Sequence, residues 1–123
     1  MMRTRSSNSS GAIYLDREAR LRQVTTMARR AAERIPAIRR VLLFGSLVNG
    51  IPTPRSDADL LVEIDGEIAT DPRDRAGQVR DAMSPLPCPV DLFVYTSAEL
   101  HELLAESAPV VTTALRDGVD LLA

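Results

Sequence analysis

The sequence holds one cysteine, one histidine, no tryptophan and no lysine. One cysteine cannot form an internal disulfide, and no paired cysteine and histidine spacing suggests zinc, so a reducing cytoplasm is the expected location. No apolar run approaches the roughly eighteen residues of a membrane-spanning helix, and we expect no membrane partner. With 3% aromatic residues and a net charge of −2, the chain lacks a stacking surface for bases. Nucleic acid is therefore not expected as the main partner.

Positive and negative charges are segregated along the chain. Residues 1–40 hold ten arginines and three acids, whereas residues 41–123 hold five arginines and fourteen acids. Arginine suits bidentate contacts to carboxylates and phosphates, but a coding bias toward arginine and alanine explains its exclusive use more simply. The arginines of the first predicted helix fall largely outside its apolar stripe. We therefore favour a solvated face over a dedicated binding face for them.

The length of the chain predicts one domain. A chain of 123 residues and 13.4 kDa can bury about two-thirds of its unfolded surface. We expect a disordered N-terminus over residues 1–12 and a single domain over residues 13–123. Apolar residues at steps of three and four predict a helix over residues 16–34, which Pro36 ends. The stripe consists of Leu21, Val24, Ala28, Ala31 and Ile35.

Strands and helices alternate after that first helix. Short apolar runs bounded by turn residues predict strands. These strands are expected over residues 39–44, 58–64 and 90–95, with a short edge strand or tail over residues 119–122. Strands that alternate with helices predict an α/β fold, here a small mixed β-sheet of three to four strands flanked by helices.

Cap residues mark where the later helices begin. Asp71 suits an N-cap and Pro72 the first helical position. Thr96 and Glu99 form a capping-box signature for the next helix. The residues of that helix predicted to face inward are Leu100, Leu103 and Leu104. A last helix is expected to begin at Pro109 and to stop at Gly118.

The most informative stretch of the sequence is residues 41–64. An apolar run ends in Gly45-Ser46, and after ten intervening residues Asp57 and Asp59 open a second apolar run that is typical of a strand. Side chains two apart on a strand project from the same face, so these two carboxylates are expected to be paired. Such a pair is costly unless a cation or a proton compensates it.

A third acid, Asp91, stands alone in another apolar run, after two prolines that mark the start of a strand. Magnesium prefers oxygen ligands, keeps several waters and bridges carboxylates to substrate phosphates. Asp57, Asp59 and Asp91 are therefore candidate ligands of Mg²⁺. A plain structural alternative stays open, in which the first two lie at an ordinary loop-to-strand edge and Asp91 faces solvent.

Together, the Gly-Ser, the ten-residue gap, the Asp-x-Asp and the later strand aspartate resemble the minimal nucleotidyltransferases (MNT) of the DNA polymerase β superfamily. The resemblance covers most of the chain and implies a nucleotidyltransferase fold like the palm of polymerase β. It implies that Gly45 and Ser46 hold the nucleotide phosphates and that Asp57 and Asp59 bind two Mg²⁺ ions. Asp91 would be the third ligand or the catalytic base.

The sequence departs from that family at one place. Many members continue the Gly-Ser as x-Ala-Arg-Gly, whereas this chain has Leu47-Val48-Asn49-Gly50, so a phosphate-neutralising arginine is missing there. Arg55 is a candidate substitute, although a loop arginine is more often simply solvated. We interpret His101 as a surface residue, because no second histidine accompanies it, and Cys88 as a packed or idle thiol.

The resemblance implies an enzyme that moves a nucleoside monophosphate, AMP from ATP, to a hydroxyl. Because the chain carries no obvious acceptor domain, we expect that hydroxyl on a partner protein. Stand-alone relatives of this size imply an antitoxin that assembles with a helical HEPN toxin. The alternative is a catalytically weak module of the same fold that neutralises or scaffolds a partner by contact. Small-molecule adenylylation, a third hypothesis, would ordinarily need an added helical domain.

Overall fold

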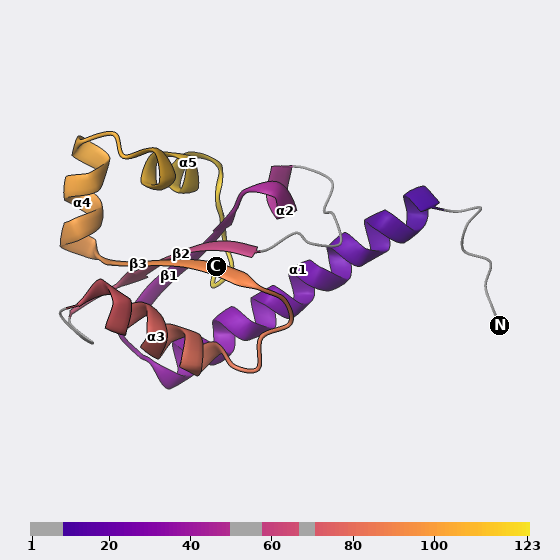
Figure 1. The fold of residues 1–123 in the computed structure, drawn as a ribbon, viewed down its shortest axis with the longest axis horizontal. Helices are drawn as coiled ribbons and strands as arrows, with labels where there is room; N and C mark the ends of the chain where they lie inside the picture. The colour runs from indigo at the N-terminus through magenta and orange to yellow at the C-terminus, as the bar shows by residue number, and fades with distance from the viewer. Residues whose placement is uncertain (1–8, 50–57, 67–70) are drawn as a thin grey trace.

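The structure of the protein, a computed structural model, describes residues 9–49, 58–66 and 71–123 (Figure 1). In chain order its elements are α1 (Ser9–Arg34), β1 (Ile38–Phe44), α2 (Ser46–Asn49), β2 (Ala58–Ile64), α3 (Pro72–Met83), β3 (Val90–Thr96), α4 (Ser97–Ala105), α5 (Pro109–Asp117) and β4 (Val119–Asp120). The predicted α/β fold with a small mixed sheet is confirmed. Within the described ranges, none of the helices has the length and apolar character that crossing a membrane requires.

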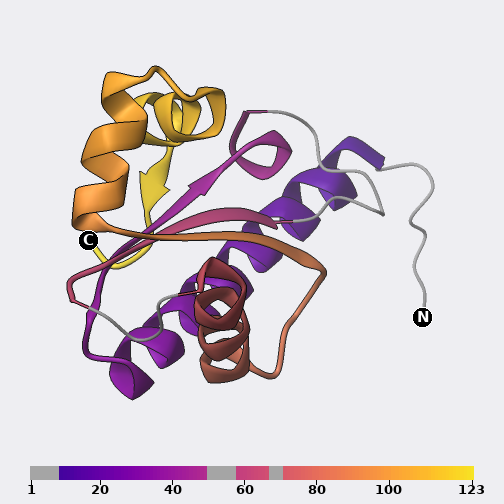
Figure 2. The ribbon, with the colours of Figure 1, turned by 60° about the vertical axis from the view of Figure 1, so that its left-hand side comes forward.

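The strands form one sheet in the order β3-β2-β1-β4. β1 runs antiparallel to β2 and to β4, whereas β2 and β3 run parallel. Parallel neighbours need a crossover connection, which α3 supplies on one face of the sheet (Figure 2). The carboxyl end of β1 and the amino ends of β2 and β3 therefore meet at one edge of the sheet. We call this edge, marked by Phe44, Ala58 and Val90, the site edge.

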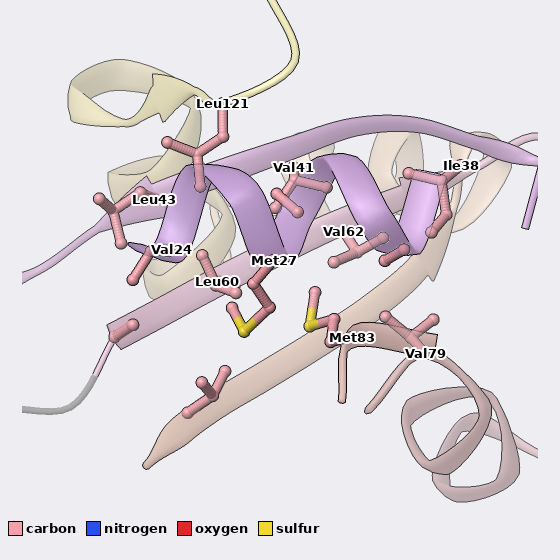
Figure 3. Close-up of a cluster of buried hydrophobic side chains, with 14 of the residues drawn as sticks. Val24, Met27, Ile38, Val41, Leu43, Leu60, Val62, Val79, Met83 and Leu121 are labelled. Atoms are coloured by element: carbon pink, nitrogen blue, oxygen red, sulfur yellow. The ribbon is translucent and has the colours of Figure 1, made fainter. Parts of the chain in front are cut away.

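Helices cover both faces of the sheet, because alternate side chains of each strand are apolar on both sides. α1 and α3 lie on one face, and α4 and α5 lie on the other (Figure 1). The larger core lies under α1 and α3 (Figure 3). Its fully buried members include Val24, Met27, Val41, Leu43, Leu60, Val62, Val79 and Met83. The smaller core, under α4 and α5, contains Leu42, Phe44, Leu61, Leu100, Val111 and Ala114.

The helix starts agree with the cap residues of the sequence. Asp71 accepts a hydrogen bond from the backbone N–H of Arg73 at 2.8 Å, and the capping box of Thr96 and Glu99 is complete. α1 begins at Ser9, earlier than the predicted residue 16, and ends at Arg34 as predicted. The proposed division of the chain at residue 12 stays a prediction, because residues 1–8 lie outside the described ranges.

One inward-facing prediction for α4 is wrong. Leu100 is buried and Leu103 packs partly against the smaller core, but Leu104 is 47% exposed. α4 rises away from the sheet toward its carboxyl end, so its last turn has no strand beneath it (Figure 1). His101 is exposed, and the free thiol Cys88 packs against the larger core, so both of these predictions are confirmed.

The predicted solvated face of α1 is wrong for Arg17, Arg20 and Arg30, which are partly buried, whereas Arg34 is exposed as predicted although it also donates hydrogen bonds. Arg20, Arg30 and Arg34 donate hydrogen bonds of 2.6–3.3 Å to backbone carbonyls within residues 82–87. Arg17 donates to two carbonyls of α2. Carbonyls at helix ends lack intrahelical partners, and long arginine side chains reach them across the edge of a core. These charges therefore tie elements together within the domain.

A partly buried ion pair joins α3 to α4, with the Glu99 side chain 39% exposed. The Arg75 side chain is 2% exposed, and its two Nη atoms donate to the two Glu99 carboxylate oxygens at 2.6 and 2.9 Å. Glu99 Oε1 also accepts from the backbone N–H of Thr96 at 2.9 Å, within the capping box. The hydrogen bonds from Arg75 hold the pKa of Glu99 below its ordinary value of 4.5, although burial acts in the opposite direction. The pair therefore fixes the start of α4 against α3.

Side chains of α3 also cover the outer edge of β3. Arg80 donates to the carbonyl of Val90 at 3.2 Å, and Arg75 donates to that of Val94 at 3.5 Å. The carbonyl of Pro89 accepts from Ala58 of β2, so by alternation the carbonyls of Val90 and Val94 point away from β2. Charged side chains on an edge strand discourage pairing with another chain.

We predict that Glu99→Gln lowers the free energy of unfolding at pH 7 by about 2 kcal/mol, because the Arg75 charge then stays buried beside a neutral amide. Glutamine retains the capping-box acceptor, so the loss reports the charge. A lowered folded-state pKa adds stability above the unfolded value and loses it as pH falls through the folded value. In urea titrations, the difference from wild type should therefore shrink below pH 4.5.

Glu102→Gln, on the exposed side of α4, is the matched control and should change stability by less than about 0.5 kcal/mol. A difference between Glu99→Gln and wild type that stays constant from pH 7 to pH 3 would contradict the assigned ion pair.

Candidate active site

The candidate site begins where β1 ends, at the site edge. Phe44 is the last residue of β1, Gly45 has a φ of +85°, and α2 follows immediately. The backbone N–H of Val48 donates to the carbonyl of Gly45 at 3.1 Å, which closes the turn. Leu47 is 1% exposed and belongs to the larger core. The turn is therefore fixed both by its own hydrogen bond and by a buried side chain.

The Asp59 carboxylate lies directly against Gly45. Asp59 pairs with Phe44 in the antiparallel register of β1 and β2, so its side chain stands beside the residue that follows. A Cβ atom built on Gly45 would collide with Asp59 Oδ2. Two constraints therefore require glycine here, since the positive φ disfavours other residues and the carboxylate occupies the space of a side chain.

Asp59 and Asp91 stand opposite each other on neighbouring strands. The parallel register of β2 and β3 pairs their Cα atoms, so both side chains project from the same face of the sheet. This is the face of α4 and α5, because Phe44, Leu61 and Phe93 on the same alternation belong to the smaller core. Asp59 is half-buried and Asp91 is exposed. Like charges directly opposite each other destabilise a sheet, which makes the pair a candidate for function.

The structure thus brings together three of the residues that the sequence singled out, Gly45, Asp59 and Asp91. Asp57 and Arg55 lie outside the described residues, and so does the side chain of Ser46, although its backbone begins α2. Their predicted roles stay predictions.

The described residues fit a divalent cation that prefers oxygen. Asp59 and Asp91 offer carboxylates on one face, and the missing Cβ of Gly45 leaves the Asp59 carboxylate room against the turn. In the part of the chain that the structure describes, which excludes Asp57, no group of three acidic, histidine or cysteine side chains is close enough to hold a metal. The two described acids thus make up part of the predicted ligand set.

One residue of this region has no counterpart among the residues predicted from the sequence. Arg17 donates from Nε to the carbonyl of Leu47 at 3.0 Å and from Nη2 to the carbonyl of Val48 at 2.8 Å. It lies 30 residues before its first acceptor, on a helix with several other arginines. No local pattern distinguishes it from them, so the sequence offered no signal that could have found it.

A family model described as "Nucleotidyltransferase domain" matches residues 24–116, about three quarters of the chain. The chain belongs to the nucleotidyltransferase domain family. It is by family a transferase, and domains of this family generally use a nucleoside triphosphate and a divalent metal. The matched range contains Gly45, Asp59 and Asp91. The resemblance inferred from the sequence is thus confirmed for the family, whereas the MNT subfamily stays a prediction.

The fold of this nucleotidyltransferase domain also has a solved counterpart. A crystal structure of a candidate nucleotidyltransferase from Sulfolobus solfataricus is similar to it with a TM-score of 0.60. The similarity covers 98% of this chain and 89% of that chain, at 21% sequence identity, and it confirms the predicted fold. Among curated protein sequences, none matches this chain.

The contact between Gly45 and Asp59 gives a test of the site geometry. Gly45→Ala should lower the free energy of unfolding by about 3 kcal/mol, through backbone strain and collision with the carboxylate. Gly66 has a φ of +95° and no atom within 4 Å of a built Cβ, so Gly66→Ala is the matched control and should cost about 1 kcal/mol for strain alone.

A double-mutant cycle separates the two causes. In an Asp59→Ala background the collision disappears, and Gly45→Ala should then cost about as much as Gly66→Ala. Chemical denaturation of wild type and these variants measures the differences. An equal cost of Gly45→Ala in both backgrounds would show that Asp59 does not lie against Gly45.

Proposed function

We propose that this domain is a Mg²⁺-dependent nucleotidyltransferase that moves AMP from ATP to a hydroxyl of a partner protein, as the MNT antitoxin of a HEPN/MNT toxin-antitoxin pair. The observation that carries the proposal is the placement of Asp59 opposite Asp91, beside the glycine turn before α2. Family membership supports nucleotidyl transfer. The base, the metal and the partner are our inference.

In the proposed reaction, the residues at the site edge have different roles. Asp59 and Asp91, with Asp57, would hold two Mg²⁺ ions, which when bound would stabilise the attacking and leaving oxygens together. Gly45 and Ser46 would bind the nucleotide phosphates. Asp91 is exposed, so an incoming acceptor hydroxyl can reach it. Its carboxylate would take the hydroxyl proton as the oxygen attacks the α-phosphorus of ATP and the bond from that phosphorus to the pyrophosphate oxygen breaks. Products are a nucleotide ester and pyrophosphate.

The negative charge of the nucleotide phosphates also needs a neutralising side chain. The segment Leu47–Gly50 lacks the arginine that many relatives carry after Gly-Ser. We propose that Arg55 replaces it, because this residue closely precedes the paired aspartates in the sequence and arginine binds phosphate oxygens bidentately.

We propose a protein acceptor because the described strands and helices build only the sheet and its two layers of helices. All of the described strands belong to one sheet, and the described helices other than α2 pack on its two faces. None of these elements forms a separate acceptor domain. A partner that presents its hydroxyl at the site edge, next to exposed Asp91, would complete the reaction. HEPN toxins are the partners that resemblance to MNT antitoxins implies.

The absent arginine favours one second candidate, a catalytically weak module of the same fold that neutralises or scaffolds its partner by contact. The enzyme would leave AMP covalently attached to its partner, whereas the contact-only module would not. Incubation with MgATP and the product of the neighbouring reading frame, a short helical protein with an Arg-x₄-His motif if the pair is as proposed, should add the mass of one AMP to that partner.

The transfer should need both the metal and the acids. Excess chelator and Asp91→Asn should each reduce the AMP adduct, measured by intact mass spectrometry, by at least about a hundredfold. Asp81→Asn removes an exposed acid from α3 and should leave the adduct unchanged. A stable complex without any adduct would instead establish the contact-only module, and an adduct that survives Asp91→Asn would remove Asp91 from the site.

A further inference from the structure

A side chain from far back in the sequence ties the Gly45 turn to α1, in addition to the apolar packing of Leu47. The guanidinium of Arg17 donates from Nε and Nη2 to the consecutive carbonyls of Leu47 and Val48, at 3.0 and 2.8 Å. Both bonds are partly buried. Two donors in one rigid plane fix the orientation of the acceptor segment as well as its distance.

The short helix α2 needs a hydrogen-bond donor from outside because of its length. A helix of four residues cannot satisfy its last carbonyls internally, and an unpaired carbonyl that is shielded from water costs free energy. A cation beside the carboxyl end of a helix is also electrostatically favourable. Arg17 therefore meets both the hydrogen-bonding and the charge requirement of this short helix.

The position of α2 decides where the glycine turn lies. The hydrogen bond from Val48 N–H to the Gly45 carbonyl couples the segment that Arg17 holds to the residue that touches Asp59. Leu47 anchors the same turn from the core side. Leu47 holds the turn through its side chain, whereas the Arg17 bonds hold the backbone of the turn, so the two contacts constrain different parts of it.

Arg17 differs from the other α1 arginines in what it holds. Arg20, Arg30 and Arg34 donate to carbonyls within residues 82–87, at the end of α3 and in the loop after it. Those acceptors belong to no part of the candidate site. Arg30, which donates to two carbonyls at 2.7 and 3.3 Å and is also half-buried, is thus a close structural match for Arg17 without its connection to the site.

We infer that Arg17 is a positioning residue for nucleotide binding, which holds the Gly45–Val48 turn at its place beside Asp59. It acts through the backbone of α2 and contacts no substrate itself. The inference deepens the proposed function and rests on it, since the turn matters to catalysis only if it receives nucleotide phosphates.

The first experiment tests the anchoring without any ligand. Hydrogen–deuterium exchange of the peptide spanning residues 45–49 should be at least about tenfold faster in Arg17→Ala than in wild type, because the turn opens locally. Arg30→Ala should leave this peptide unchanged and instead speed exchange around residues 82–87. Unchanged exchange at residues 45–49 in Arg17→Ala would overturn the inference.

The second experiment tests the connection to function. In calorimetric titrations with MgATP, Arg17→Ala should raise Kd about tenfold, because the free energy of about one charge-assisted contact no longer holds the turn in its binding position. Arg17→Lys should raise Kd less, because lysine keeps the charge but not the planar pair of donors. Arg30→Ala should change Kd less than about twofold while it lowers the melting temperature by a similar amount to Arg17→Ala.

The outcomes distinguish a failure of the positioning role from a failure of the proposed function. If wild type binds MgATP and Arg17→Ala binds it equally well, Arg17 is a structural tie only and the inference fails while the proposed function stands. The inference fails in the same way if Arg30→Ala weakens binding as much as Arg17→Ala. If wild type itself does not bind MgATP, the proposed function fails and the positioning role falls with it.

Discussion

The parallel pairing of β2 with β3 determines both how the two cores are filled and which side chains meet at the candidate site. The register of β2 and β3 pairs Asp59 with Asp91, and a slip of one residue would turn one of them to the opposite face of the sheet. The register is held by apolar side chains that alternate toward two cores, so neither strand can shift without exposing buried leucine and valine. The sheet thus keeps together two charges that would separate in a less constrained chain.

Arginine supplies many of the ties that hold the helices to this sheet. Four arginines of α1 and two of α3 donate to backbone carbonyls, and buried Arg75 adds a partly buried ion pair with Glu99. Part of the basic character of the first forty residues therefore has an internal explanation. It neither requires a nucleic-acid partner nor reflects a fully solvated face, and it connects the long first helix to the turn beside Asp59.

The fold and part of the site could be predicted because their signals are local. Gly45 marks a turn between two apolar runs, and Asp59 and Asp91 each interrupt a run that is otherwise typical of a buried strand. Family membership agrees with the spacing of these residues. The caps at Asp71 and Thr96 were equally predictable, since a capping side chain bonds within three residues of itself.

What could not be predicted depends on contacts between distant segments. The acceptors of Arg17 lie 30 and 31 residues away, and nothing near Arg17 in the sequence indicates them. Leu104 has the spacing of an inward residue, but the tilt of α4 removes the strand beneath it. Arg75 did carry a usable signal, because it lies four residues before buried Val79 on the inner stripe of α3. An arginine at such a position implies a buried partner.

We propose that Asp59 and Asp91 hold a divalent cation beside Gly45. Manganese suits the same oxygen ligands as magnesium, and its unpaired electrons broaden the NMR signals of nearby amides. Substoichiometric Mn²⁺ with ATP should selectively broaden the amides of Gly45, Asp59 and Asp91, and Asp91→Asn should abolish that pattern. Broadening confined to another acidic segment, such as Glu102 of α4 and the Glu106 that follows it, would show that the paired carboxylates are not the metal site.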